Sequence, residues 1–194
     1  EEPEIHIDAE IELVYVVNLV EKICELMKNK IMHIPKINIK ADRSIKVSDI
    51  LSKLVLFKKS YLESKIIPAL NTNFEINLFN TFRLYIDSND LPQKLNINSD
   101  KRGFLFEIVK ELTGGQTFFS LTNTGITRGN HFHTRKVERF CVVSGNAIIR
   151  LRKIGDNKIS EYRVTGKNPM AIDMPIYHTH NIENIGKTDL LTLF

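Results

Sequence analysis

Apolar residues in the first part of the chain recur with the period of an α-helix. Residues 16–27 place their apolar side chains on one stripe, which predicts an amphipathic helix. A second helix is expected over residues 47–70, where Pro68 should kink or end it. Residues 74–86 form a third apolar stretch with a weaker helical period. Between the helices, the alternation in residues 37–39 predicts a short strand.

From about residue 100 onward the pattern changes to short apolar strands. Turn residues such as Gly114-Gly115 and Ser144-Gly145-Asn146 lie between them. Many short strands at regular spacing are typical of a sandwich or barrel. The expected strands cover residues 104–109, 117–121, 138–143, 147–152, 159–164 and 190–194.

The composition of residues 88–99 is that of a linker, because Ser, Asn, Asp and Pro dominate and few residues are apolar. We therefore predict a helix-rich part over residues 1–87, a linker over 88–99, and an all-β domain over 100–194.

Composition places the chain among globular proteins, with 42% hydrophobic and 26% charged residues in a total of 194. No run of 18 apolar residues is present, so we expect no membrane span. The two cysteines, Cys24 and Cys141, lie in apolar runs and are too few for a disulfide scaffold, which fits a reducing cytoplasm.

Charge is distributed unevenly along the chain. Residues 1–100 hold 13 Lys and Arg against 15 Asp and Glu, whereas residues 101–194 hold 14 against 8. A basic second half favours an anionic ligand. Because no Arg- or Lys-rich run and no aromatic stacking motif is present, we expect a phosphorylated small molecule rather than nucleic acid.

The candidate chemistry lies in two pairs of histidines. His131 and His133 have the spacing that, on a strand, places both imidazoles on one face. Glu138 follows five residues later, and His180 would supply a third imidazole from across the barrel. Three nitrogen ligands and one carboxylate suit Zn, Fe, Mn or Ni, and we expect one divalent metal, first of all zinc.

The spacing of these residues resembles the first motif of the cupin superfamily. That motif is Gly, five residues, His-x-His, three or four residues, Glu, six residues and Gly. It is matched by Gly125, His131, His133, Glu138 and Gly145. The resemblance implies a double-stranded β-helix, or jelly-roll barrel.

The second cupin motif, Pro-x-Gly-x-x-His-x-x-x-Asn, is matched by Pro175, His180 and Asn184. Tyr177 stands where the family has Gly.

Residues 124–136 are similar to the sugar-nucleotide branch of the cupins and, within it, to the CapF family of capsular polysaccharide biosynthesis enzymes. That family fuses an extended short-chain reductase domain to a C-terminal cupin. Ile5–Asp8 with Glu12–Val20 resembles a late strand-and-helix segment of such reductases, and Phe74–Phe82 the run that closes the reductase domain. The resemblance implies that residues 1–87 are the C-terminal portion of an extended short-chain reductase-like domain.

The family resemblance also implies a reaction. The cupin inverts C3 of a UDP-linked 2-acetamido-2,6-dideoxy-4-hexulose on the route to UDP-N-acetyl-L-fucosamine, and the reductase domain then reduces the C4 ketone with NADPH. No Gly-x-x-Gly-x-x-Gly fingerprint follows a strand, so we expect NADPH to serve only the full-length reductase domain. Tyr61 and Lys65 match the reductase Tyr-x-x-x-Lys pattern, but they lie out of order, and we interpret the match as chance.

Epimerisation at C3 needs a base, an acid and stabilisation of the enolate. The metal would polarise the ketone, or it would be purely structural. His178, Tyr177 and Lys136 are the candidates for base and acid, although each also suits an outward-facing or turn position. Arg128 is a candidate contact for the diphosphate, with a surface charge as the alternative.

Two other classes of function share these residues. One is a sugar-binding cupin without catalysis, and the other is a metal-dependent dioxygenase that uses Fe(II) on the same His and Glu set. The family resemblance also implies a homodimer.

Overall fold

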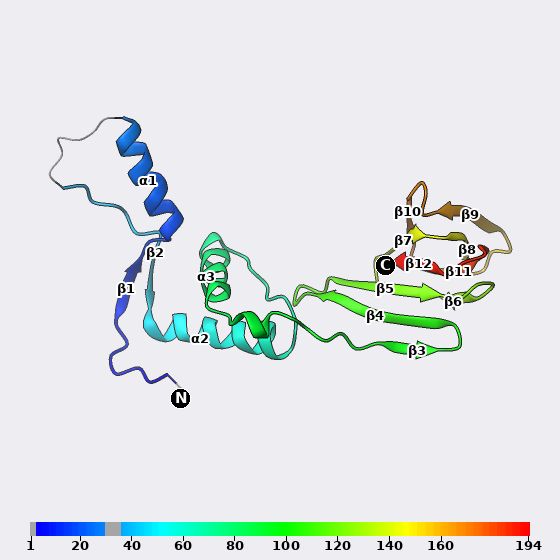
Figure 1. Cartoon of the computed structure of the whole chain (residues 1–194), viewed down its shortest axis with the longest axis horizontal. Coiled ribbons are helices and arrows are strands. Elements are labelled where there is room, and N and C mark those ends of the chain that lie inside the picture. Colours follow the sequence, from blue (N-terminus) through cyan, green and yellow to red (C-terminus); the bar gives the residue numbers. More distant parts are fainter. Residues whose placement is uncertain (1–2, 30–35) are drawn as a thin grey trace. The chain divides into compact units, whose positions relative to one another are not determined.

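The computed structural model describes residues 3–29 and 36–194 (Figure 1). The chain divides into two compact units, the first up to Gln93 and the second from Lys94 to Phe194. In the described part of the chain, no helix is both long enough and apolar enough to cross a membrane.

The first unit is mainly helical, with one two-stranded antiparallel sheet of β1 and β2. Its elements are β1 (Glu10–Leu13), α1 (Val16–Lys28), β2 (Arg43–Lys46), α2 (Val47–Phe57), a π-helix (Lys58–Glu63), α3 (Asn73–Leu84) and a 3-10 helix (Ser88–Asp90).

The sequence predicted the helices of this unit better than its strands. Helix α1 confirms the stripe over residues 16–27. The prediction of a strand at residues 37–39 is wrong, because in the described part of the chain β1 pairs with β2 at Arg43–Lys46 and no described strand pairs with residues 37–39. The strand before α1 is Glu10–Leu13 rather than Ile5–Asp8. Asp8 instead accepts hydrogen bonds from the backbone and hydroxyl of Ser48 at the start of α2.

The helix expected over residues 47–70 is shorter than predicted and changes form. It continues from α2 into the π-helix and ends at Glu63. The Ser60 hydroxyl donates to the carbonyl of Leu56 at 2.7 Å, and such bonds compete with regular helix hydrogen bonds. Lys65 then adopts a φ of 60°, so the helix has already stopped before Pro68.

Capping hydrogen bonds begin α3, which covers the weakly periodic stretch only from Asn73 to Leu84 and not to residue 86. The Thr72 hydroxyl accepts from the backbone N–H of Glu75 at 3.2 Å, and the Glu75 carboxylate accepts from the backbone of Asn71. Phe79 packs edge-on against Phe57, with ring centroids 5.1 Å apart, which joins α3 to α2.

The second unit confirms the all-β prediction. A six-stranded sheet has the order β10-β7-β12-β5-β4-β3, and a four-stranded sheet has the order β6-β11-β8-β9. The strands are β3 (Asn98–Asp100), β4 (Gly103–Lys110), β5 (Gln116–Thr122), β6 (Thr127–His131), β7 (Glu138–Ser144), β8 (Asn146–Lys153), β9 (Ile159–Thr165), β10 (Ala171–Met174), β11 (His178–Asn184) and β12 (Leu190–Leu193). Strands β3, β6, β10 and β11 were not among those expected, because their sequences lack apolar alternation.

Side chains from both sheets form one core. Phe140 and Val142 of β7 and Leu190 of β12 meet Ile149 of β8 and Ile182 of β11. Asn184, at the end of β11, is 1% exposed, and its amide donates to the carbonyls of Thr122 and Thr188. Its side-chain oxygen accepts from the backbone of Gly186.

We predict that Asn184→Ala lowers the free energy of unfolding by about 3 kcal/mol, because it leaves buried backbone groups without partners. Asn157→Ala, in the exposed β8–β9 turn, is the matched control and should change stability by less than about 0.5 kcal/mol. Urea unfolding of both variants measures the difference. Equal stabilities would show that the Asn184 hydrogen bonds do not hold the two sheets together.

Candidate metal centre

Two facing strands position the first pair of ligands. His131 ends β6 and lies opposite His180 in β11. The two backbones approach so closely at Gly129 that a Cβ there would lie 2.8 Å from the His180 carbonyl oxygen, and Gly129 has a φ of 100°. Glycine is therefore required at this position to bring His131 against His180.

The other two ligands come from the segment that leaves β6. His133 lies in the loop after the strand, so the expected arrangement of both histidines on one strand is wrong, although their imidazoles still converge. Glu138 is the first residue of β7. The loop is held from the other side by the backbone N–H of Tyr177, which donates to the His133 carbonyl at 2.9 Å.

Tyr177 has a φ of 58°, the left-handed conformation that favours the glycine of the cupin motif. The turn is kept nevertheless, because the backbone of Tyr177 is bonded on both sides: its N–H to His133 and its carbonyl to the N–H of Ile154, each at 2.9 Å.

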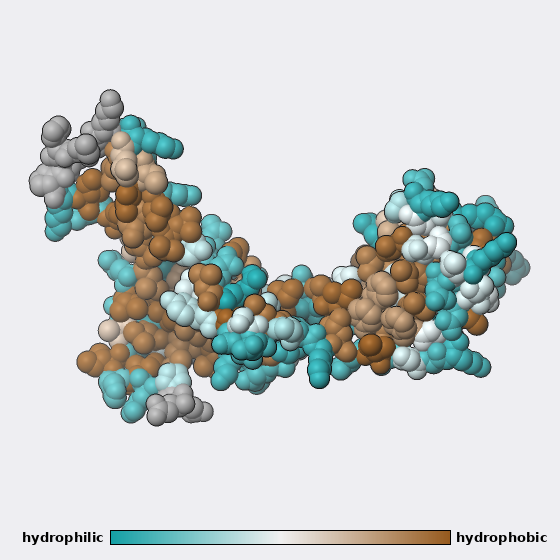
Figure 2. All heavy atoms as spheres, in the orientation of Figure 1, coloured by the Kyte–Doolittle hydropathy of each residue, from teal (hydrophilic) through white to brown (hydrophobic). Residues whose placement is uncertain are grey.

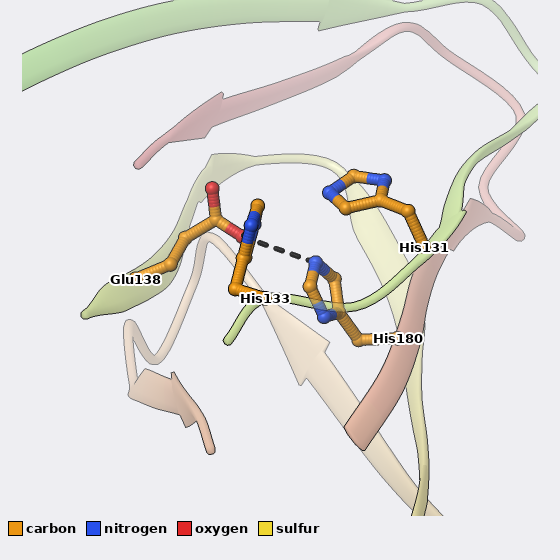
Figure 3. A group of neighbouring side chains, drawn as sticks. All are labelled: His131, His133, Glu138 and His180. Carbon is orange, nitrogen blue, oxygen red and sulfur yellow. Dashed lines mark hydrogen bonds and ion pairs between the residues drawn. The ribbon is translucent and has the colours of Figure 1, made fainter. Parts of the chain in front are cut away.

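The structure brings all four predicted metal ligands together (Figure 3). One ligand atom from each of His131, His133, Glu138 and His180 lies within 4.8 Å of the others. Glu138 and His180 are buried, His133 is half-buried and His131 is exposed, so the group opens to solvent on the His131 side. The Phe140 ring packs edge-on against the His180 ring, with the two ring centroids 5.8 Å apart. Sequence analysis did not assign Phe140 to the site, although it shares the inward face of β7 with Glu138.

The electrostatics of the group favour an ionised carboxylate. Burial tends to raise the pKa of the Glu138 carboxyl, but the contacts with His180 and Lys136, with His133 nearby, lower this pKa to about 2. The ammonium of Lys136 donates to Oε1 of Glu138 at 2.6 Å. Burial lowers the pKa of the His131 imidazole, and the neighbouring His180 and His133 rings lower it further. Neutral imidazoles beside a carboxylate are the protonation states in which these groups bind a metal.

An unpartnered buried atom indicates that the residues fit a cation. Nδ1 of His180 lies 3.3 Å from the carbonyl of His178, which can only accept, so a proton on Nδ1 satisfies this contact and Nε2 is directed at Glu138. Among the described residues this buried Nε2 is assigned no hydrogen-bond partner, yet it lies 3.0 Å from Oε2 of Glu138. A proton or a metal ion between Nε2 and Oε2 would stabilise this close approach, and three imidazole nitrogens with one carboxylate oxygen suit a divalent transition metal.

The candidate acid and base residues lie at different distances from this group. Lys136 contacts Glu138 directly, and the two line a groove of about 510 Å³ together with Gln116–Phe118 and Leu193. His178 is two residues before His180, and its Nδ1 lies 3.0 Å from the carbonyl of Ile176. The side chain of Tyr177 is 51% exposed.

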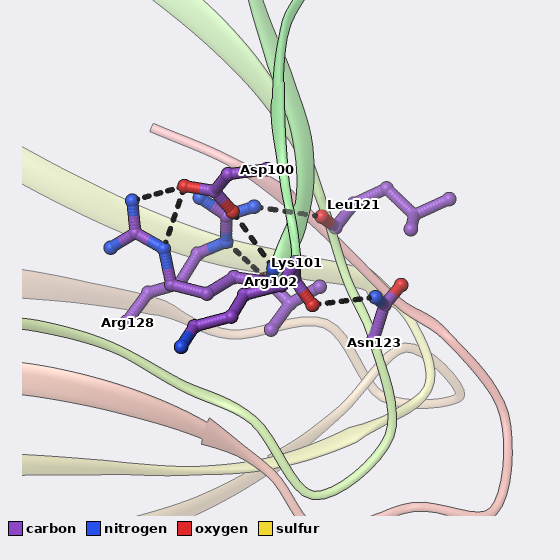
Figure 4. A network of polar contacts seen from close by, with 7 residues as sticks. Asp100, Lys101, Arg102, Leu121, Asn123 and Arg128 are labelled. Carbon is purple, nitrogen blue, oxygen red and sulfur yellow. Dashed lines mark hydrogen bonds and ion pairs between the residues drawn. The ribbon is translucent and has the colours of Figure 1, made fainter.

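Arg128 belongs to a network of polar contacts within the protein (Figure 4). Its guanidinium donates from Nε to the Thr122 hydroxyl at 3.1 Å and from Nη2 to the Leu121 carbonyl at 3.4 Å. These partners are at the C-terminal end of β5, whereas the groove is lined by its N-terminal end. Burial lowers the pKa of Arg128, and the nearby Arg102 guanidinium lowers it further. The structure thus gives Arg128 contacts within the protein, and its role toward a diphosphate stays a prediction.

Comparisons with known proteins agree with this architecture. A family model described as "Polysaccharide biosynthesis C-terminal domain" matches residues 98–194. The chain is 26% identical over 185 residues to UDP-2-acetamido-2,6-beta-L-arabino-hexul-4-ose reductase of Pseudomonas aeruginosa, and the match covers 95% of the chain and 50% of the relative.

Solved structures of the capsular polysaccharide assembling protein CapF are also similar. CapF from Staphylococcus aureus is 35% identical, with a TM-score of 0.85 over 100% of this chain and 57% of that one. CapF with the inhibitor 3-isopropenyl-tropolone has a TM-score of 0.84 at the same identity and coverage. The second unit is therefore a cupin-like β-sandwich, as expected, and the chain spans about half the length of these relatives.

We predict that replacing both His131 and His133 by Ala lowers bound divalent metal well below one equivalent and reduces the melting temperature, because half of the ligand set is lost. His6→Ala, in the first unit, is the control and should leave both quantities unchanged. Elemental analysis of the purified variants measures the metal. Stoichiometric metal in the double variant would contradict the assignment of these ligands.

Proposed function

Because the chain belongs to the polysaccharide biosynthesis C-terminal domain family, we propose that it carries the cupin part of an enzyme that makes a capsular polysaccharide sugar. The reaction proposed is inversion of C3 in a UDP-linked 2-acetamido-2,6-dideoxy-4-hexulose. Support comes from the four converging candidate ligands beside an open groove. The similarity to CapF and to a relative named as a reductase of a UDP-linked hexulose also supports it. The proposed location is the cytoplasm, where nucleotide sugars are the substrates of such enzymes.

The first part of the chain has a different proposed role. We propose that residues 1–87 are the C-terminal portion of a reductase-like domain and that residues 88–99 link it to the cupin. The match to the reductase includes 95% of this chain, and hence most of its first part, but only 50% of the reductase, which supports this proposal. In the complete enzyme, this domain would use NADPH on the C4 ketone after epimerisation.

Metal binding would supply one part of the chemistry. A divalent ion held by His131, His133, Glu138 and His180, with zinc proposed first, would act as a Lewis acid toward the C4 ketone and make the C3 proton more acidic. Lys136 fixes one carboxylate oxygen of Glu138, which leaves the other oxygen directed at the imidazoles.

His178 is the proposed base. Its Nδ1 lies against the Ile176 carbonyl, which can only accept, so Nδ1 carries the proton and Nε2 is left free to take one. Tyr177, exposed and next in sequence, is the proposed acid that returns a proton to the opposite face of C3. Lys136 is the alternative for either role.

We predict that the chain exchanges deuterium from heavy water into C3 of the UDP-linked 4-keto sugar without any reduced cofactor, because proton abstraction next to a ketone needs no hydride. His178→Asn should reduce this exchange by about 10²–10⁴-fold with metal content unchanged. His6→Asn is the matched control and should exchange at the normal rate. NMR of the recovered sugar measures the exchange.

Other outcomes of this experiment separate the rival functions. Loss of metal in His178→Asn would make His178 a ligand, and an unchanged rate would transfer the base role to Tyr177 or Lys136. Absence of exchange in the unmodified chain with sugar still bound would indicate a sugar-binding cupin. Oxygen uptake with bound iron would indicate a dioxygenase.

We also predict that the chain does not bind NADPH with micromolar affinity. All nine glycines lie at or after Gly103, so the first unit has no glycine-rich turn to approach a pyrophosphate. Fluorescence titration with NADPH measures binding. A saturable micromolar isotherm would show that the first unit holds a nucleotide site of another kind.

A further inference from the structure

Strand β6 contains one residue more than the stretch of β11 that lies opposite it. Arg128 of β6 pairs with Ile182 of β11, and His131 pairs with His180, so three steps along β6 match two steps along β11. The register shifts between these two pairs, which identifies a β-bulge. Asn130 is the extra residue of the bulge, and it directly precedes the candidate ligand His131.

The bulge decides the direction in which His131 points. Side chains alternate between the two faces of a regular strand, so residues three apart point to opposite faces. Arg128 points inward, because its guanidinium reaches the buried hydroxyl of Thr122. His131 also points inward, because its ring centroid lies 4.6 Å from that of the buried His180 (Figure 3). Without the extra residue, His131 would face away from the other three candidate ligands.

Two asparagine side chains hold the bulge in place. Asn130 has a φ of 65°, a left-handed conformation that asparagine adopts more readily than most residues. The amide Nδ2 of Asn181 on β11 donates to Oδ1 of Asn130 at 2.8 Å. Asn181 also packs directly on Gly129, since a Cβ on that glycine would lie 2.9 Å from the Asn181 Cα atom. Asn130 and Asn181, here called the bulge clasp, thus join the two strands at the bulge.

The bulge clasp lies on the outer side of the two strands. Asn181 follows the inward-pointing His180, so the alternation along β11 directs its side chain to the outer face. The exposed Asn130 meets it there. Figure 2 shows hydrophilic residues over the part of the second unit where β6 and β11 lie. An ion held by the inward ligands is therefore out of reach of both amides, which can affect it only through the strands that carry His131 and His180.

The Asn181 amide is not an ordinary solvated surface group. Its oxygen Oδ1 is buried and is assigned no hydrogen-bond partner among the described residues. Burying an amide oxygen without a partner costs free energy, so the amide is expensive to keep at this position. Its bond to Asn130 is the contact that offsets this cost.

We propose that the bulge clasp is a positioning device that aims the His131 imidazole at the other three candidate ligands. The proposal rests on the metal centre and is independent of the reaction of the sugar. Groups that orient metal ligands from outside typically change metal affinity by about 10–100-fold when they are removed. The bulge clasp should therefore affect zinc affinity although neither amide is a ligand.

Zinc affinity, measured by competition with a chromophoric chelator, tests the proposal. Asn181→Ala removes the donor of the bulge clasp and should weaken zinc binding by about 10-fold or more. Asn130→Gly keeps the left-handed backbone but loses the amide, and it should have the same effect. Asn130→Asp keeps an acceptor for Asn181 and should retain the affinity of the unmodified chain. Asn157→Ala, in the exposed β8–β9 turn, is the matched control and should bind zinc normally.

Two further backgrounds separate positioning from a general structural role. In a His131→Ala chain, which keeps three ligands, Asn181→Ala should change zinc affinity no further, because the side chain that the bulge clasp positions is absent. In a His133→Ala chain, whose lost ligand lies outside the bulge, Asn181→Ala should again weaken zinc binding by about 10-fold. Equal losses in all three backgrounds would overturn the proposal, since the bulge clasp would then only hold the strands together. Unchanged affinity of Asn181→Ala would also overturn it.

The absorption spectrum of bound Co²⁺ gives a second readout. The spectrum of Asn181→Ala should move toward that of His131→Ala, and a spectrum identical to that of the unmodified chain would overturn the proposal. Asn130→Gly replaces Asn181→Ala in every comparison if the latter does not fold. An unmodified chain that binds no zinc would overturn the metal centre together with this proposal. Failure of C3 exchange with these zinc results intact would affect the proposed epimerisation alone.

Discussion

Four candidate ligand side chains converge at one edge of the sandwich, and two of them, Glu138 and His180, are buried, so the surrounding residues must offset the cost of burying polar groups. A buried carboxylate without partners costs several kcal/mol. Glu138 avoids this cost because Lys136 and His133 bond its two oxygens. Nε2 of His180 lies 3.0 Å from Oε2 of Glu138, and it is assigned no hydrogen-bond partner among the described residues. Metal binding would therefore stabilise the fold as well as supply chemistry.

Backbone conformations that few residues adopt make this convergence possible. Gly129 allows β6 to approach β11, and Asn130 follows it with a φ of 65°, its side chain accepting a hydrogen bond from Asn181. Tyr177 completes the set from the other side by fixing the His133 loop. A tyrosine in the left-handed region is strained, and such strain persists only where the surroundings hold it. The site is thus built on three short segments from different parts of the chain.

On strands β5 and β12 of the six-stranded sheet, hydroxyl side chains point inward and apolar side chains point outward. Hydroxyls of Ser120, Thr122 and Thr192 lie inside, where the Thr122 hydroxyl accepts from Arg128 and the Thr192 hydroxyl has no partner. Phenylalanine and leucine lie outside. The interior beside the strands that carry the candidate ligands is consequently more polar than an ordinary core, while apolar side chains of β5 and β12 lie on the outer face of the sheet.

Sequence alone determined the features that depend on local spacing. Periodicity predicts the helical stripe of α1 and the strands β4, β5, β7, β8, β9 and β12, because side-chain direction is fixed by the period of the element. The motif spacing predicts the four candidate ligands. The sequence did not determine β6 and β11, which carry His131 and His180, since polar strands show no apolar alternation. It also predicted a strand at residues 37–39 that the pairing of β1 with β2 leaves without a partner.

Tertiary structure alone decided which groups contact one another. The acceptance of Tyr177 at a glycine position depends on backbone atoms of His133 and Ile154, which come from distant segments. The placement of Arg128 at the far end of β5 likewise depends on how that strand is packed. Such contacts cannot be inferred from spacing, because they arise only when two sheets pack at a particular register.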